Sequence, residues 1–93
     1  MEVHAKDEYT IEVLKTNHTV LNLVRWAIGQ FESVHEVDLV GYTIPHPMEE
    51  RALMKIQLKK EESQTREAIM DVFRRGVAAT QSVIDKIQAE MLK

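Results

Sequence analysis

The sequence predicts an α+β fold, a single domain over residues 1–93 in which a small antiparallel or mixed sheet carries two helices in the order β-α-β-β-α. Two observations lead to this prediction. Apolar residues first recur at every second position, which is typical of a strand, and then at every third or fourth position, which is typical of a helix. The longest helical pattern comes last, and it is longer than the predicted strands can cover.

The first strand and the first helix follow one another directly. Residues 9–15 alternate between apolar and polar side chains, which predicts a half-buried strand with Tyr9, Ile11 and Val13 on one side. Residues 16–19 are rich in side chains that can cap a helix. From residue 19 to residue 31 the apolar spacing becomes helical, so this segment is the first predicted helix.

Residues 37–42 and 52–58 are predicted to form two further strands, because both are rich in β-branched and large apolar side chains. Pro45 and Pro47 separate them, and proline cannot donate a hydrogen bond to a strand ladder. Since the two strands are close in sequence, we expect them to pair in an antiparallel way. The connection between them, residues 44–50, is longer than a tight hairpin turn.

A polar break separates the last strand from a long final helix, which Ser63 is predicted to cap and which runs to about residue 92. The apolar residues of this helix fall in one stripe that is about 140° wide. Part of the stripe alternates spacings of four and three residues, the heptad pattern of paired helices. Those residues are Ile69, Phe73, Gly76, Thr80, Val83 and Ile87.

The predicted sheet is too short to cover this helix. A helix of about 25 residues is roughly 40 Å long, whereas a strand of about six residues spans only about 20 Å. Ile84, Ile87 and Met91 would then lie in water. Burying each is worth about 1.5–3 kcal/mol, a large share of the stability of a small domain. We expect a partner to cover them; the alternative is that the last turns fray or fold back on the first helix.

The composition argues against several classes of function. The chain has 12 basic and 15 acidic residues, and the basic residues are not gathered in one segment, so direct nucleic-acid binding is not expected. It has no cysteine, which removes disulfides, thiolate catalysis and cysteine metal sites. Residues 1–8 lack a signal-peptide pattern and no apolar run is long enough to span a bilayer, so we expect a soluble intracellular protein.

No catalytic, cofactor or metal site is predicted. The four histidines have no short ligand spacing, and the three glycines are too scattered for a phosphate-binding loop. An RNA-binding module of KH type needs a GxxG loop, which this sequence lacks. No nucleophile–base arrangement can be recognised, although pairs that are distant in sequence stay invisible. An enzyme is therefore the least favoured class.

Several motifs resemble the alpha-like subunits of eukaryotic and archaeal RNA polymerases. Residues 17–25, Asn-His-Thr-Val-Leu-Asn-Leu-Val-Arg, resemble the start of that family's first helix, where an acidic-His-Thr-Leu-Gly-Asn pattern is followed shortly by Leu-Arg. Residues 41–47, Gly-Tyr-Thr-Ile-Pro-His-Pro, look like its Gly-Tyr-x-x-x-His-Pro motif. Residues 53–57 resemble its third strand and residues 83–86 its terminal helix, so the resemblance covers nearly the whole chain.

The resemblance implies a non-catalytic assembly subunit of a DNA-directed RNA polymerase in the nucleus. It implies a heterodimer with a larger alpha-like subunit, formed through the helices, on which the two large catalytic subunits assemble. Val24-Arg25 and residues 83–86 look closer to the smaller subunit shared by polymerases I and III than to that of polymerase II. Two positions depart from the family pattern: Asn17 replaces an acidic residue, and Leu21 replaces a glycine.

The apolar stripe and the resemblance together predict a partner interface on the two helices. Its predicted residues are His18, Thr19, Asn22, Trp26, Phe73, Val77, Thr80, Ile84, Ile87 and Met91. Some have a second interpretation, since His18 can be merely solvated beside a helix cap and Trp26 can be a half-buried surface ring. For the whole chain, the alternative is a homodimeric βαββα interaction module unrelated to transcription.

Overall fold

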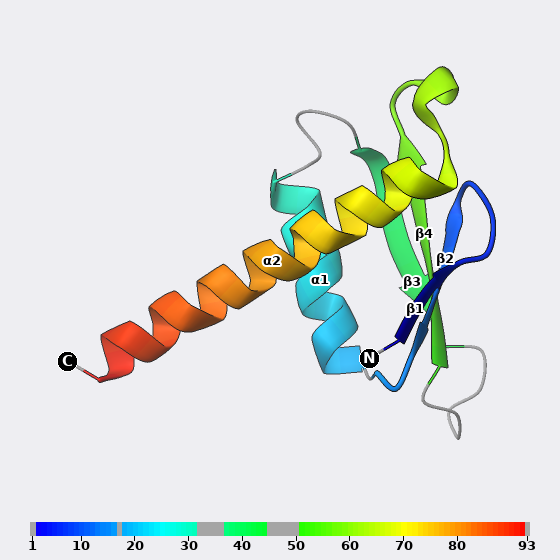
Figure 1. Cartoon of the computed structure of the whole chain (residues 1–93). Coiled ribbons are helices and arrows are strands. Elements are labelled where there is room, and N and C mark those ends of the chain that lie inside the picture. Colours follow the sequence, from blue (N-terminus) through cyan, green and yellow to red (C-terminus); the bar gives the residue numbers. More distant parts are fainter. Residues whose placement is uncertain (1, 17, 32–36, 45–50, 93) are drawn as a thin grey trace.

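The computed structural model describes residues 2–16, 18–31, 37–44 and 51–92, and in these residues four strands form one sheet with two long helices on one side (Figure 1). The elements are β1 (Glu2–Ala5), β2 (Thr10–Leu14), α1 (His18–Phe31), β3 (Val37–Thr43), β4 (Arg51–Leu58) and α2 (Arg66–Met91). A short 3-10 helix, Glu61–Ser63, precedes α2. The predicted α+β fold with a long C-terminal helix is confirmed. Asn17, the predicted cap residue, and residues 45–50 of the predicted loop lie outside the described residues.

Each strand pair in the sheet is antiparallel, and the strand order is β1-β2-β4-β3. β3 pairs with β4 as predicted, from Val37 opposite Leu58 to Thr43 opposite Leu53. Along β4 the even-numbered residues are buried and face the helices, whereas the odd-numbered residues point to the other face of the sheet. One face of the sheet is therefore packed, and the other carries the more polar residues.

The prediction of three strands missed β1. This strand pairs with β2, placing Val3 opposite Val13 and Ala5 opposite Ile11. Val3 and Ala5 are half-buried, while Glu2 and His4 are exposed. Two apolar residues in a four-residue segment are too short a pattern to stand out in a polar terminus. β1 forms because it can pair with the edge of β2, and this edge exists only once the sheet has assembled.

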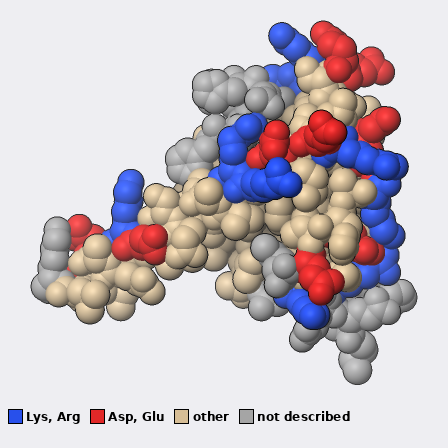
Figure 2. Space-filling model, viewed as in Figure 1, with Lys and Arg blue, Asp and Glu red and all other residues tan. Residues whose placement is uncertain are grey.

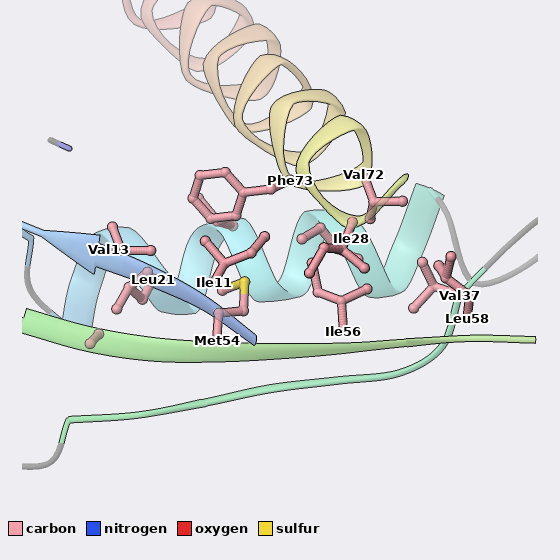
Figure 3. Packing of buried hydrophobic residues seen from close by; sticks show 13 residues of the cluster. Ile11, Val13, Leu21, Ile28, Val37, Met54, Ile56, Leu58, Val72 and Phe73 are labelled. Atoms are coloured by element: carbon pink, nitrogen blue, oxygen red, sulfur yellow. The ribbon is translucent and has the colours of Figure 1, made fainter. Parts of the chain in front are cut away.

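The core fills the space between the sheet and the two helices (Figure 3). Its side chains are aliphatic, apart from Phe73 of α2. The fully buried members with the largest side chains include Ile11 and Val13 of β2, Leu21 and Ile28 of α1, Met54 and Ile56 of β4, and Ile69 and Val72 of α2. Each contributes about 1.5–3 kcal/mol by leaving water, so this cluster is what holds the helices against the sheet.

α2 begins two residues later than the sequence predicts. Thr65 is the capping residue, because its Oγ1 accepts a hydrogen bond from the backbone nitrogen of Ala68 at 3.1 Å. Ser63, the predicted cap, lies in the short 3-10 helix instead. The residue between them, Gln64, is only 8% exposed and determines where α2 starts.

The side-chain amide of Gln64 joins three parts of the chain. Its Oε1 accepts a hydrogen bond from the backbone nitrogen of Leu58 at 2.8 Å, and its Nε2 donates to the carbonyl oxygen of Ile56 at 2.9 Å. The same Nε2 donates to the carbonyl oxygen of Glu8, just before β2. Gln64 therefore ties the end of β4 to β2 and to the start of α2.

We expect Gln64→Leu to lower the free energy of unfolding by about 2–3 kcal/mol, because it leaves a buried N–H and a buried carbonyl without partners. Urea denaturation followed by circular dichroism measures this change. Gln57→Leu is the matched control, since Gln57 of β4 is exposed and its replacement should change stability by less than about 0.5 kcal/mol. Equal effects of the two variants would contradict the role given to Gln64.

The turn between β1 and β2 is closed by Asp7. Its Oδ1 accepts hydrogen bonds from the backbone nitrogens of Tyr9 and Thr10, both at 2.8 Å. The bond from Tyr9 is the main reason that the pKa of Asp7 lies below its ordinary value of 3.8, and the charge of Lys55 acts in the same direction. The ionised carboxylate is thus the form that the folded turn prefers.

Asp7→Asn tests this preference, because asparagine keeps an oxygen acceptor but cannot ionise. The pKa of Asp7 is lower in the folded state, so its charge stabilises the fold above the unfolded pKa, and this contribution is lost as the pH falls through the folded pKa. We expect the parent to lose more free energy of unfolding than Asp7→Asn between about pH 6 and about pH 2. Parallel pH dependences of the two proteins would contradict this.

Candidate partner interface

The two helices cross at Gly76 of α2. A Cβ atom added there would lie 2.5 Å from Cγ1 of Ile28 and 3.5 Å from Cγ1 of Val24, both on α1. Only glycine lets the helices approach this closely. One turn further along, the hydroxyl of Thr80 donates to the carbonyl oxygen of Gly76 at 2.9 Å and lies 3.4 Å from the carbonyl oxygen of Leu23. The crossing thus fixes the direction in which the rest of α2 leaves the body.

Gly76→Ala is expected to lower the free energy of unfolding by about 1–3 kcal/mol, because the added methyl group overlaps with the buried side chain of Ile28. Gly29→Ala on α1 is the matched control. Beyond the neighbouring backbone of α1, no described residue has an atom within 4 Å of a Cβ added at Gly29, so this change should raise stability by about 0.5–1 kcal/mol through helix propensity alone. Thermal unfolding measures both, and stabilisation by Gly76→Ala would contradict the close crossing.

Beyond Thr80, α2 runs past α1 and projects from the body (Figure 1). The face that is buried around Phe73 continues along this projecting half at spacings of three and four residues. Exposure rises along it, from 2% at Phe73 to 54% at Ile87 and 79% at Met91. The described residues of the chain therefore leave the C-terminal part of the apolar stripe of α2 uncovered, as the comparison of helix and strand lengths predicts.

The projecting half of α2 carries a shallow apolar depression with charged groups at its rim. Its lining consists of Val83, Lys86, Ile87, Glu90 and Met91. Figure 2 shows a mostly uncharged surface on the underside of the projecting helix, with the charged groups gathered on its upper side. An apolar centre with a polar rim is the usual composition of a protein–protein interface.

α1 adds exposed apolar side chains beside the crossing. Val20 is 38%, Leu23 40% and Trp26 45% exposed, whereas Leu21, Val24 and Ile28 of the same helix are buried. The contact between the Leu23 carbonyl and Thr80 places this row next to the point at which α2 leaves α1. The sequence did not predict Val20 and Leu23 as interface residues. The spacing of apolar residues along a helix does not show which of them are buried in the chain's own core and which stay exposed.

We call the exposed and half-buried apolar residues on these two helices the helical surface: Val20, Leu23 and Trp26 of α1, and Val83, Ile84, Ile87 and Met91 of α2. Most of the predicted interface residues lie on or beside it. Thr19 and Asn22 are exposed on α1, and Val77, Thr80 and Ile84 are half-buried on α2. The side chain of His18, at the start of α1, lies outside what the structure describes.

Phe73 requires a correction. Its ring points from α2 into the core beside Ile11 and is 2% exposed (Figure 3). The heptad spacing places Phe73 in the same stripe as Ile87, but the sheet covers the first half of that stripe and not the second. Phe73 therefore stabilises the fold, and it is not part of the helical surface.

Within the described residues, no three His, Asp or Glu side chains lie close enough together to hold a metal ion. Neither described helix combines the length and the apolar character that a membrane crossing requires.

Comparison with known proteins identifies the family to which this arrangement belongs. Residues 8–90 match the family model of the RNA polymerase Rpb3/Rpb11 dimerisation domain, a range that includes β2, α1, β3, β4 and almost all of α2. The chain belongs to this family. The resemblance to alpha-like polymerase subunits that the motifs indicate is thus confirmed.

Three relatives of the chain carry the name of one subunit. The chain is 27% identical over 84 residues to "DNA-directed RNA polymerases I and III subunit RPAC2" of Drosophila melanogaster, a match that covers 90% of this chain and 71% of the fly protein. It is 30% identical over 50 residues to the probable RPAC2 proteins of Caenorhabditis elegans and Caenorhabditis briggsae. Those matches cover 54% of this chain and only about a third of each nematode protein.

Proposed function

We propose that this chain is a non-catalytic assembly subunit of a DNA-directed RNA polymerase, and that it forms a heterodimer with a larger alpha-like subunit through the helical surface. The observation that carries this proposal is the exposed apolar face of α2, where Ile87 and Met91 remain in water. Membership of a family of dimerisation domains supports it.

The energetics favour an occupied helical surface. An exposed side chain of this size forgoes about 1.5–3 kcal/mol compared with a buried one, and a small domain has only a few kcal/mol of net stability. The projecting half of α2 extends away from the sheet (Figure 1), so it adds little to the fold of the isolated chain. A partner helix laid along it would bury Ile87 and Met91 and would meet Leu23 and Trp26 beside the crossing.

The finer assignments follow from the relatives. Their printed names associate them with polymerases I and III, and we propose the same two enzymes, and hence a nuclear location, for this chain. In this role, residues 1–93 form one dimerisation domain, and the heterodimer is the platform on which the large catalytic subunits assemble. Neither catalysis nor direct nucleic-acid binding is assigned to this chain.

The decisive experiment is co-expression with the larger alpha-like subunit of the same organism, followed by affinity purification. We expect a stoichiometric complex with the parent chain. Ile87→Asp combined with Met91→Asp should weaken pairing by at least about a hundredfold, because it places two charges where apolar contact is required. Both side chains are exposed in the free chain, so its fold should be unchanged.

The matched control carries the same two charges on the opposite face of α2. Ala78 and Ala89 are exposed and lie outside the apolar stripe, so Ala78→Asp with Ala89→Asp should pair like the parent. A stable homodimer of the parent that does not exchange for the larger subunit would favour the self-associating module instead. If the variant with Ile87→Asp and Met91→Asp pairs as well as the parent, the helical surface is not the interface.

A further inference from the structure

A second surface of the molecule, the outer edge of β3, is open to pairing. Within the described residues the sheet has β1 and β3 at its edges. β1 has four residues and β3 has seven. Natural edge strands are usually protected by lysine, proline, bulges or short length. β3, with the sequence Val-Asp-Leu-Val-Gly-Tyr-Thr, has one charged residue, Asp38, and one irregularity, between Val37 and Leu39.

The protection is confined to the beginning of β3. From Leu39 to Thr43 the strand keeps a regular register with β4. Leu39 is 63% exposed and stands opposite Gln57, while Thr43 is exposed and stands opposite Leu53. Because the even-numbered residues of β4 point into the core, these odd-numbered pairs lie on the outer face of the sheet. The edge is therefore a regular strand with an apolar side chain beside it.

Gly41 lies between these two residues, and because it has no side chain it leaves the space beside Lys55 open. It is paired with Lys55 of β4, which is exposed on the outer face. Apart from the two chain neighbours of Gly41, no described residue has an atom within 4 Å of a Cβ built there, so within the described part of the chain this position leaves Lys55 open toward the edge. Among the described residues Lys55 forms no ion pair, although its charge contributes to the low pKa of Asp7 on the β2 side.

We propose that the outer edge of β3 binds an extended acidic segment of a partner protein as an added strand, with a carboxylate opposite Gly41 that pairs with Lys55. Neighbouring strands lie about 4.8 Å apart, so the added strand would be about 10 Å from β4. This distance can be spanned by two long side chains, a lysine on β4 and a glutamate on the added strand, that extend toward one another over the glycine. Backbone hydrogen bonds supply the pairing, and Leu39 contacts an apolar residue two positions from the carboxylate.

The charges around the edge favour an acidic peptide over a nucleic acid. On the outer face near Lys55, Arg51 and Lys6 both form ion pairs with Glu12, and the edge strand itself carries Asp38. In a chain of net charge −3 these groups do not form the basic surface that a phosphate backbone requires. The proposal does not rest on the polymerase assignment, because no residue of the helical surface takes part. Failure of either proposal therefore leaves the other standing.

Two capped heptapeptides test the proposal: Thr-Val-Thr-Glu-Thr-Val-Thr and its twin with lysine in place of glutamate. Each is titrated to millimolar concentration into the isotope-labelled full chain, and backbone amide shifts and hydrogen exchange are followed by NMR. We expect shifts and slowed exchange at residues 39–43, with the glutamate peptide bound about three- to tenfold more tightly than the lysine peptide.

Two variants make the test specific. Lys55→Glu should reverse the preference in favour of the lysine peptide, since the exposed charge is the only part changed. Gly41→Val keeps the strand edge but inserts a side chain between Lys55 and the peptide, so binding should persist while the preference for glutamate disappears. The proposal is overturned if neither peptide perturbs residues 39–43, or if Lys55→Glu leaves the preference unchanged.

Discussion

The close contact between α1 and α2 at Gly76 sets the geometry on which the rest of the molecule depends. Because a hydrogen atom takes the place of a side chain there, Ile28 and Val24 can pack directly against the backbone of α2. Thr80 then joins the two helices through its hydroxyl group. With the crossing held at this point, Ile69, Val72 and Phe73 lie over the sheet and the later turns of α2 lie beyond it.

This division gives one helix two roles. Its first half completes the core, and Gln64 anchors its start to the end of β4 through buried hydrogen bonds. Its second half presents the same apolar face to water. A helix anchored at one end is a suitable binding element, since its backbone is already folded and less conformational entropy is lost on pairing than in the folding of a disordered segment. The family to which the chain belongs, that of the Rpb3/Rpb11 dimerisation domain, fits such an arrangement.

Strong periodicity made much of the fold predictable. The 26 residues of α2, the 14 of α1 and the alternation along β4 stand out in the sequence, because each extends over several turns or pleats. β1 does not stand out, since it has only two half-buried residues and forms a strand only by pairing with β2. α2 begins two residues later than predicted because Ser63 belongs to the 3-10 helix and Thr65 caps α2, with the buried Gln64 between them.

The sequence alone determined the class of fold, the order of the main elements and the excess of apolar surface on the last helix, because these depend on local spacing and on length. Only the tertiary structure decided how that surface is divided. Phe73 and Ile87 occupy equivalent places in the repeat, yet one is in the core and the other in solvent. The reason is that burial depends on what lies opposite a side chain, and the crossing at Gly76 places the sheet opposite the first residue and not the second.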